Sequence, residues 1–402
     1  MKIKLSAGLN LTLYSLLLIV TPFLMLMNFL QEAIGSISRA NFTLYGFEVP
    51  YVVVAAAVLL IALTIFLFKY ITWKRLIGLV ILTVLFFIGQ NSTDYYFNHK
   101  FYELQHNWHY FAYGIFTFLA YRKFMELGYP TAKVILRTFL LAFVISLFDE
   151  LIQVYISNRV FDLSDVGKDM WGVIIGQCGI YFVYFEYGFL QPFRIRHKKL
   201  KDYLKNPFTV LFFEMVLAYT LLVIASLLSS AEYWKSVVLI SILIFGLIFV
   251  LIHLGNNRFL KYTIGFISAA LALYFVVAQF TGNARVKRYS DNIIIYKGIP
   301  FVYFDLMIYP EGGFRPVDKK SQFLLRDKQK LDDLNPNILL LATGTKGEGG
   351  KGFNEQRIFE FKPNLFKSTV YQVIRLKNQD AIKHYNLLIS ENKKVLFIIH
   401  NQ

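Results

Sequence analysis

Charged residues are scarce in this chain of 402 residues, at 17% of the total, against about 25% in average soluble domains. Hydrophobic residues make up 56%, and they include 40 Phe and 26 Tyr. This balance argues against an ordinary soluble domain and favours a membrane protein.

Cysteine is almost absent. Cys178 is the one cysteine, and it lies in an apolar run. It has no partner for an internal disulfide, so we expect it to pack in a core. A metal centre needs a tighter set of His, Cys and carboxylate ligands than His109 supplies. The sequence therefore predicts no metal site and no cofactor.

Acidic residues are also outnumbered, with 26 Asp and Glu against 42 Lys and Arg, for a net charge of +16. The basic residues cluster between apolar segments, as they do in the cytoplasmic loops of membrane proteins. Nucleic-acid binding is therefore not expected.

The long apolar runs lack the period-two alternation of strands and exceed typical strand length. Nine windows are long enough to span or nearly span a bilayer. The first has no small-residue cleavage site after it, so we expect an anchor. The sequence predicts a mostly α-helical, polytopic bundle over residues 1–280. The windows are 10–30, 50–69, 75–90, 108–122, 134–155, 169–190, 208–229, 234–254 and 260–280.

Lys and Arg gather before the first window and after the second, fourth and sixth. The positive-inside bias places such segments in the cytoplasm. We therefore expect a multi-pass protein of the cell membrane with a cytoplasmic N-terminus. Residues 31–49, 91–107 and 156–168 are then expected outside.

A polar cluster interrupts the apolar sequence between residues 149 and 169. Ionisable groups at membrane depth are costly, so they mark a candidate functional site. Two carboxylates here precede a small-xxx-small stripe, Gly172 and Gly176, that lets another helix approach closely. Arg159 is expected to clamp a carboxylate or a ligand phosphate. The candidate ligand-binding residues are His109, Asp149, Glu150, Gln153, Arg159, Asp165 and Asp169. The alternative is a helical hairpin pinned by internal salt bridges.

These residues also carry a resemblance. D-E-x-x-Q-x-Y-x-x-x-R from Asp149, Ser-Asp-Val at 164–166 and G-x-x-x-G from Gly172 resemble the signature of the VanZ-like membrane proteins. His109-x-x-x-Tyr113 is similar to an earlier helix of that family, and the resemblance covers about residues 75–190. Asp169 stands where the family usually has asparagine. The family is named for a teicoplanin-resistance protein, which implies an envelope ligand.

Two classes of function follow, with a scaffold role as a third. The first is binding of an envelope ligand, either a glycopeptide antibiotic or a lipid-linked precursor, beside membrane lipid. The second is an intramembrane enzyme in which Asp149 and Glu150, with His109 nearby, perform acid–base chemistry. Elsewhere in the bundle, Glu186 and Glu214 are expected to pair with the basic segment 194–205.

Residues 281–402 differ in composition and predict a separate, small α+β domain. Strand-like runs occupy 293–296, 301–304, 338–341 and 395–399. The glycine-rich run 344–350 lacks a Walker pattern, so a tight loop is favoured over a nucleotide site. The segments 309–313, 337–347 and 384–388 resemble a domain of archaeal proteins and of the mitochondrial complex I assembly factor three family. That resemblance implies a three-layer β/β/α fold. Nine crossings would place this domain outside, whereas Arg285, Lys287 and Arg288, directly after the ninth window, favour the inside.

Overall fold

The computed structural model describes most of the chain, with gaps between the described ranges. These ranges are 6–24, 33–34, 36–37, 40–45, 47–93, 104–155, 161–190, 193–229, 231–255, 258–281, 284–290, 293–319, 336–347, 349, 358–361 and 369–401. The chain divides into two compact units. The first is Met1–Thr93, His99–Ala225 and Trp234–Asn256, and the second is Asp94–Asn98, Ser226–Tyr233 and Asn257–Gln402.

Each of the nine apolar windows overlaps a helix in the described part of the chain. These helices are α1 (Ala7–Leu24), α3 (Tyr51–Leu67), α4 (Trp73–Thr93), α5 (Leu104–Glu126), α6 (Thr131–Gln153), α7 (Leu163–Cys178), α10 (Pro207–Leu227), α11 (Trp234–Leu254) and α12 (Arg258–Thr281). Shorter elements are the hairpin β1 (Asn41–Leu44) and β2 (Phe47–Pro50), and the short helices α8 (Tyr187–Leu190) and α9 (Leu200–Tyr203).

Five helices in the described residues are long and apolar enough to cross a membrane. They are Trp73–Thr93, Thr131–Gln153, Pro207–Leu227, Ala231–Leu254 and Arg258–Ala278. α1 and α3 contain shorter apolar stretches. α5 and α7 carry much of the polar cluster. The chain is thus mostly helical with several membrane-length helices, as its composition predicts, while nine crossings stay a prediction.

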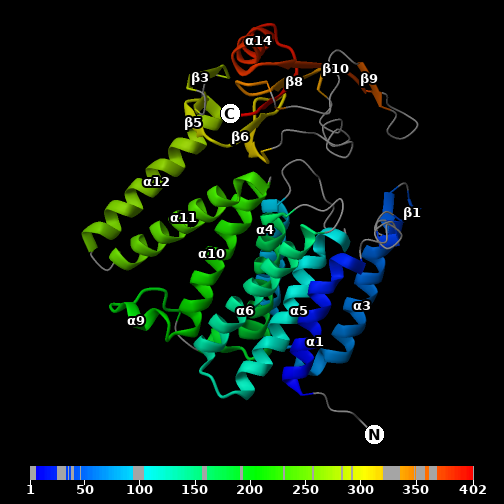
Figure 1. The fold of residues 1–402 in the computed structure, drawn as a ribbon, viewed down its shortest axis with the longest axis vertical. Helices are drawn as coiled ribbons and strands as arrows, with labels where there is room; N and C mark the ends of the chain where they lie inside the picture. Colours follow the sequence, from blue (N-terminus) through cyan, green and yellow to red (C-terminus); the bar gives the residue numbers. More distant parts are fainter. Residues whose placement is uncertain are drawn as a thin grey trace. The chain divides into compact units, whose positions relative to one another are not determined.

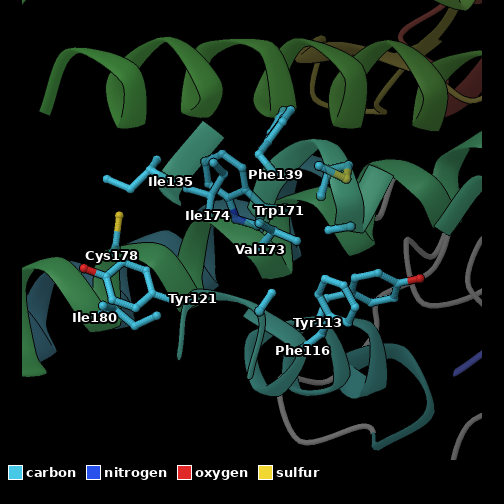
Figure 2. Close-up of a cluster of buried hydrophobic side chains, with 14 of the residues drawn as sticks. Tyr113, Phe116, Tyr121, Ile135, Phe139, Trp171, Val173, Ile174, Cys178 and Ile180 are labelled. Atoms are coloured by element: carbon cyan, nitrogen blue, oxygen red, sulfur yellow. The ribbon is translucent and has the colours of Figure 1, made fainter. Parts of the chain in front are cut away.

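The core of the first unit lies where α5, α6 and α7 meet. Figure 1 shows α5 and α6 side by side in this unit. Figure 2 shows Phe116 of α5, Phe139 of α6 and Trp171 of α7 among its buried side chains. Cys178 is buried in the same cluster, which confirms its expected packing role. After α7 the helix continues as a π-helical segment, η2, over Gly179–Tyr184.

The second unit holds the C-terminal sheets. A three-stranded antiparallel sheet has the order β3 (Val286–Ser290), β4 (Ile293–Tyr296) and β5 (Ile299–Val302). A six-stranded mixed sheet has the order β7-β6-β11-β8-β10-β9. Its strands are β6 (Asp305–Ile308), β7 (Phe314–Val317), β8 (Ile338–Ala342), β9 (Ile358–Phe361), β10 (Thr369–Leu376) and β11 (Val395–Ile399).

The central strands β8 and β11 are buried throughout, as expected for strands covered on both faces. Leu340 and Phe397 pack in one cluster with helix α14 (Asn378–Ser390) and with β3 and β4. The alternate residues Leu339 and Leu396 join a separate cluster. A sheet-containing C-terminal region is therefore present, while its description as a three-layer fold stays a prediction, as does a domain boundary after residue 280.

The connection between α10 and α11 belongs to the second unit. The backbone N–H of Lys319 donates to the carbonyl of Leu227 (3.0 Å), and Ser229 Oγ donates to Asp318 Oδ1 (2.8 Å). The rings of Tyr233 and Tyr303 meet edge to face. These contacts fix the connection to the C-terminal end of β7.

Candidate functional site

Close packing of α5 against α7 creates the site. A Cβ added at Gly172 would lie 2.8 Å from the carbonyl oxygen of His109 and 3.0 Å from the Cα of Tyr110. One at Gly176 would lie 2.9 Å from the Cβ of Thr117. The two glycines therefore bring the α5 backbone against α7, as the small-residue stripe predicts.

This packing places His109 beside a buried carboxylate. His109 Nδ1 lies 2.8 Å from Oδ1 of Asp169, and Ser146 Oγ of α6 donates to Oδ2 of Asp169 (2.7 Å). The Asp169 side chain is 1% exposed, whereas that of His109 is 23% exposed. Three helices thus contribute one continuous chain of polar groups, and its histidine end reaches the surface of the unit.

A second carboxylate and a lysine lie next to this chain. Asp165 Oδ1 is 3.8 Å from His109 Nε2, and Lys168 Nζ donates to the same Oδ1 (2.6 Å). The site therefore combines Asp165 and Asp169 with one permanent cation. The prediction omitted Lys168, although its i, i+3 spacing from Asp165 could have identified it.

Glu150 and Gln153 form the part of the cluster where α6 ends. Gln153 Nε2 donates to Glu150 Oε1 (2.6 Å), and the backbone N–H of Asp162 donates to Glu150 Oε2 (3.0 Å). Both side chains are buried. Glu150 thus ties the end of α6 to Asp162 at the start of α7 through hydrogen bonds, whereas the hairpin alternative expected salt bridges.

Asp162 begins α7. Its Oδ1 accepts from the backbone N–H of Ser164 (2.7 Å), the bond expected of a helix N-cap. Burial, with the nearby charge of Asp165 as the next cause, raises the pKa of Asp162 to about 6. Nothing in the sequence pattern singled out this aspartate, because a capping role depends on where the helix starts.

Of the seven predicted site residues, His109, Asp165 and Asp169 meet directly, and Glu150 and Gln153 form a bonded pair. Asp149 is half-buried and adjoins Glu150 on α6. Arg159 lies outside the described residues. Ser146, which joins the chain through Asp169, was missed because a single serine in an apolar helix gives no distinguishing pattern.

An open groove with a volume of about 360 Å³ lies between α4 and α10. Val84, Phe87, Ile88 and Tyr219 supply most of its apolar lining. Tyr219 also contacts the ring of Trp171, two residues beyond Asp169. Through this ring contact the groove adjoins α7, the helix that also carries Asp165 and Asp169.

The arrangement limits the chemistry. Ser146 donates to Asp169 rather than to His109, so the serine, histidine and aspartate are not in the order of a nucleophilic triad. Among the described residues, no group of three His, Cys, Asp or Glu side chains could hold a metal ion. What remains is a polar site with hydrogen-bonding, anionic and cationic groups.

Glu186 and Glu214, the two carboxylates expected to pair with the basic segment 194–205, are not part of this cluster. Glu186 Oε1 pairs with Nε of Arg75 (3.1 Å) and accepts from Thr72 Oγ1 (3.1 Å). Glu214 lies next to Gln177. The expected pairing of Glu186 with the segment 194–205 is therefore wrong, because the start of α4 provides a nearer arginine. For Glu214, the described residues contain no such ion pair.

Comparison with known protein families bears on residues 52–191. This segment matches the VanZ/LLP1 family model. The match contains every described residue of the polar cluster and extends beyond the predicted range of 75–190. The VanZ-like resemblance is thus confirmed for this part of the chain. No curated protein and no solved structure matches the chain, and the resemblance of the C-terminal region stays a prediction.

Proposed function

We propose that this protein is a multi-pass cell-envelope protein that binds a lipid-linked envelope precursor at the cluster around His109 and Asp169. The observation that carries the proposal is the chain from Ser146 through Asp169 to a partly exposed His109, with Asp165 and Lys168 beside it. Ionisable side chains inside a membrane bundle reduce its stability, so their presence indicates a functional role. In this proposal the nine helices cross the membrane, the N-terminus is cytoplasmic and the cluster faces outward.

The apolar groove favours a lipid-linked ligand over a soluble one. Lys168 offers a charged donor to phosphate, and His109 and Asp165 offer polar contacts to a head group. The groove beside Tyr219 offers an apolar surface to a chain of isoprenoid type. A glycopeptide antibiotic is the other ligand suggested by the resemblance to VanZ-like proteins.

The C-terminal region is proposed to be a three-layer domain on the outer side. Its contacts with the α10–α11 connection support a common side of the membrane for both segments. With nine crossings, that side is the outside.

Binding measurements on the full chain in nanodiscs test the proposal. The probes are a polyprenyl-diphosphate-linked saccharide and teicoplanin. We expect the wild type to bind the lipid-linked probe, and His109→Gln and Asp165→Asn each to weaken binding at least about tenfold, as loss of a charged contact does. Glu186→Gln is the matched control, because it also removes a paired carboxylate but lies outside the cluster, and it should bind normally.

The other outcomes are informative. Saturable binding of teicoplanin alone would replace the lipid-linked ligand with the glycopeptide. Conversion of the lipid-linked probe, lost in His109→Gln, would favour the intramembrane acid–base enzyme, for which the His109–Asp169 pair is the specific observation. Absence of binding to both probes by the wild type would overturn the proposal.

A further inference from the structure

Glu214 is a carboxylate in the apolar interior of the first unit. It lies on α10, one of the helices long and apolar enough to cross a membrane, and it is 5% exposed. It follows Pro207 by seven residues, which is about 10 Å at 1.5 Å per residue and leaves about 20 Å to the other end of the helix. A crossing α10 therefore carries Glu214 inside the hydrocarbon layer.

The neighbours of Glu214 do not provide a positive charge. Val210, Leu211 and Ala218, one turn away on the same helix, are buried apolar residues. Gln177 of α7 adjoins the carboxyl group and is the polar side chain that acts on it. No charged side chain among the described residues acts on Glu214. Two titratable side chains of the segment before α10 bond to other groups. His197 bonds to Thr209 Oγ1, and Tyr203 bonds to His253.

Hydrogen bonding at this position is incomplete. Within the described residues, neither carboxyl oxygen of Glu214 has a hydrogen-bond partner, and the same holds for Oε1 of Gln177. The other end of the Gln177 amide is fixed, since its Nε2 donates to the carbonyl of Ile135 on α6 (3.0 Å). Oε1 of the same amide is an acceptor that has no donor among the described residues.

A proton bound to Glu214 would remove both the uncompensated charge and the missing hydrogen bond. An ionised carboxylate without a cation is costly to bury in an apolar interior, whereas a neutral carboxylic acid is not. The neutral acid also gains one O–H donor, and a buried amide oxygen without a donor is the acceptor it needs. Ionisation would remove that donor and leave three buried acceptor oxygens together.

We infer that Glu214 is a proton-binding residue that carries its proton at neutral pH and donates it to Oε1 of Gln177. This site is separate from the polar cluster, because Gln177 and Asp169 are eight residues apart on α7, or about 12 Å along the helix. One helix, α7, therefore contacts a ligand-type polar cluster near its start and a proton site near its end. The inference does not depend on the identity of the ligand.

Infrared spectroscopy of the full chain in nanodiscs tests the inference. At neutral pH, Glu214→Gln should remove a carbonyl stretching band of a protonated carboxylic acid, and the melting temperature should stay that of the wild type. Glu232→Gln, an exposed glutamate in the α10–α11 connection, is the matched control and should leave this band in place. Loss of ionised-carboxylate bands in Glu214→Gln would overturn the inference.

A second measurement needs no variant. Hydrophobic carbodiimides react with protonated carboxyl groups in apolar surroundings, so mass spectrometry of the treated wild type should find the label on Glu214 and not on Glu232. Absence of label on Glu214 at neutral pH, with label on another buried carboxyl as proof of reagent access, would also overturn the inference.

Discussion

Each of the two units buries an aspartate against a histidine, and the two pairs have almost the same length. In the helical unit, Asp169 lies 2.8 Å from His109, and in the C-terminal unit, Asp305 lies 2.7 Å from His400. The His109 side chain is 23% exposed and that of His400 is 6% exposed. The same pair is thus open at one position and enclosed at the other.

The Asp305–His400 pair is surrounded by further hydrogen bonds and an ion pair. Asp305 Oδ1 accepts from the backbone N–H of Asn401 (2.9 Å) and lies 3.5 Å from Nζ of Lys319. Lys319 is fully buried and also donates to the carbonyls of Tyr303 (2.6 Å) and Asn401 (2.7 Å). Its burial lowers the pKa of Lys319. These bonds fasten β6 to the residues after β11, so the pair has a structural role.

Among the described residues, no lysine pairs with Asp169 of the open pair. Asp169 bonds to two side chains, His109 and Ser146, and a second carboxylate, Asp165, lies on the other side of His109. In the helical unit, the histidine is partly exposed beside further charged groups, which is why this pair is proposed as part of a functional site. In the C-terminal unit, a backbone N–H and a buried lysine hold the pair, which indicates a structural role.

The largest effect should come from Asp305→Asn. It leaves the buried charge of Lys319 without its carboxylate, and breaking a buried pair costs about 3–5 kcal/mol. The matched variant Asp169→Asn should cost about 1 kcal/mol, because the asparagine oxygen still accepts from His109 and no lysine in the described part of the chain bonds to Asp169. Thermal unfolding measures the cost of both variants. Limited proteolysis of residues 281–402 also detects unfolding caused by Asp305→Asn. Equal costs would show that the two pairs have the same role.

An intermediate effect is expected for Gly172→Ala. The added Cβ meets backbone atoms of His109 and Tyr110, so α5 must move, at a cost of about 1–3 kcal/mol. The movement also separates His109 from Asp169. Gly114→Ala is the control, because its Cβ would have 4.0 Å to the nearest atom, the Gly172 carbonyl oxygen. Thermal melting of both variants checks this, and equal melting temperatures would contradict the close approach.

The smallest effect concerns pH. The pKa of Asp162 is about 6 in the folded protein and about 3.9 in an unfolded chain, so the fold disfavours its ionised form. As pH falls from 7 toward 4, the folded state takes up this proton first, and the free energy of unfolding should rise. Asp162→Asn should remove this contribution.

Thermal melting at several pH values measures the effect. Asp202 provides a control of opposite sign, because a hydrogen bond from Lys205 lowers the pKa of this exposed carboxyl. Its contribution, small on the surface, is lost as pH falls. An Asp162→Asn variant with the pH dependence of the wild type would show that Asp162 is not the group responsible.

Local features of the sequence predicted much of the fold. Each apolar window overlaps a helix, because a long apolar run without period-two alternation favours a helix over a strand. The runs 293–296 and 395–399 are β4 and β11, and 338–341 is β8 extended by one residue. The run 301–304 was displaced, since β5 covers Ile299–Val302 and Tyr303 has a positive φ of 72° that ends the strand. β3, β6, β7, β9, β10 and α14 were missed, because apolar runs alone do not indicate short strands or an amphipathic helix.

The sequence by itself determined where the helices lie, that a polar cluster interrupts them, and that Gly172 and Gly176 permit close packing. The tertiary structure decided the partners: Ser146 with Asp169, Arg75 with Glu186, and Asp305 with His400. Composition and periodicity are properties of neighbouring residues, whereas a hydrogen bond between distant residues depends on the depth and rotation at which two elements pack. Contacts made far along the chain set that depth and rotation, as the glycines of α7 do for His109.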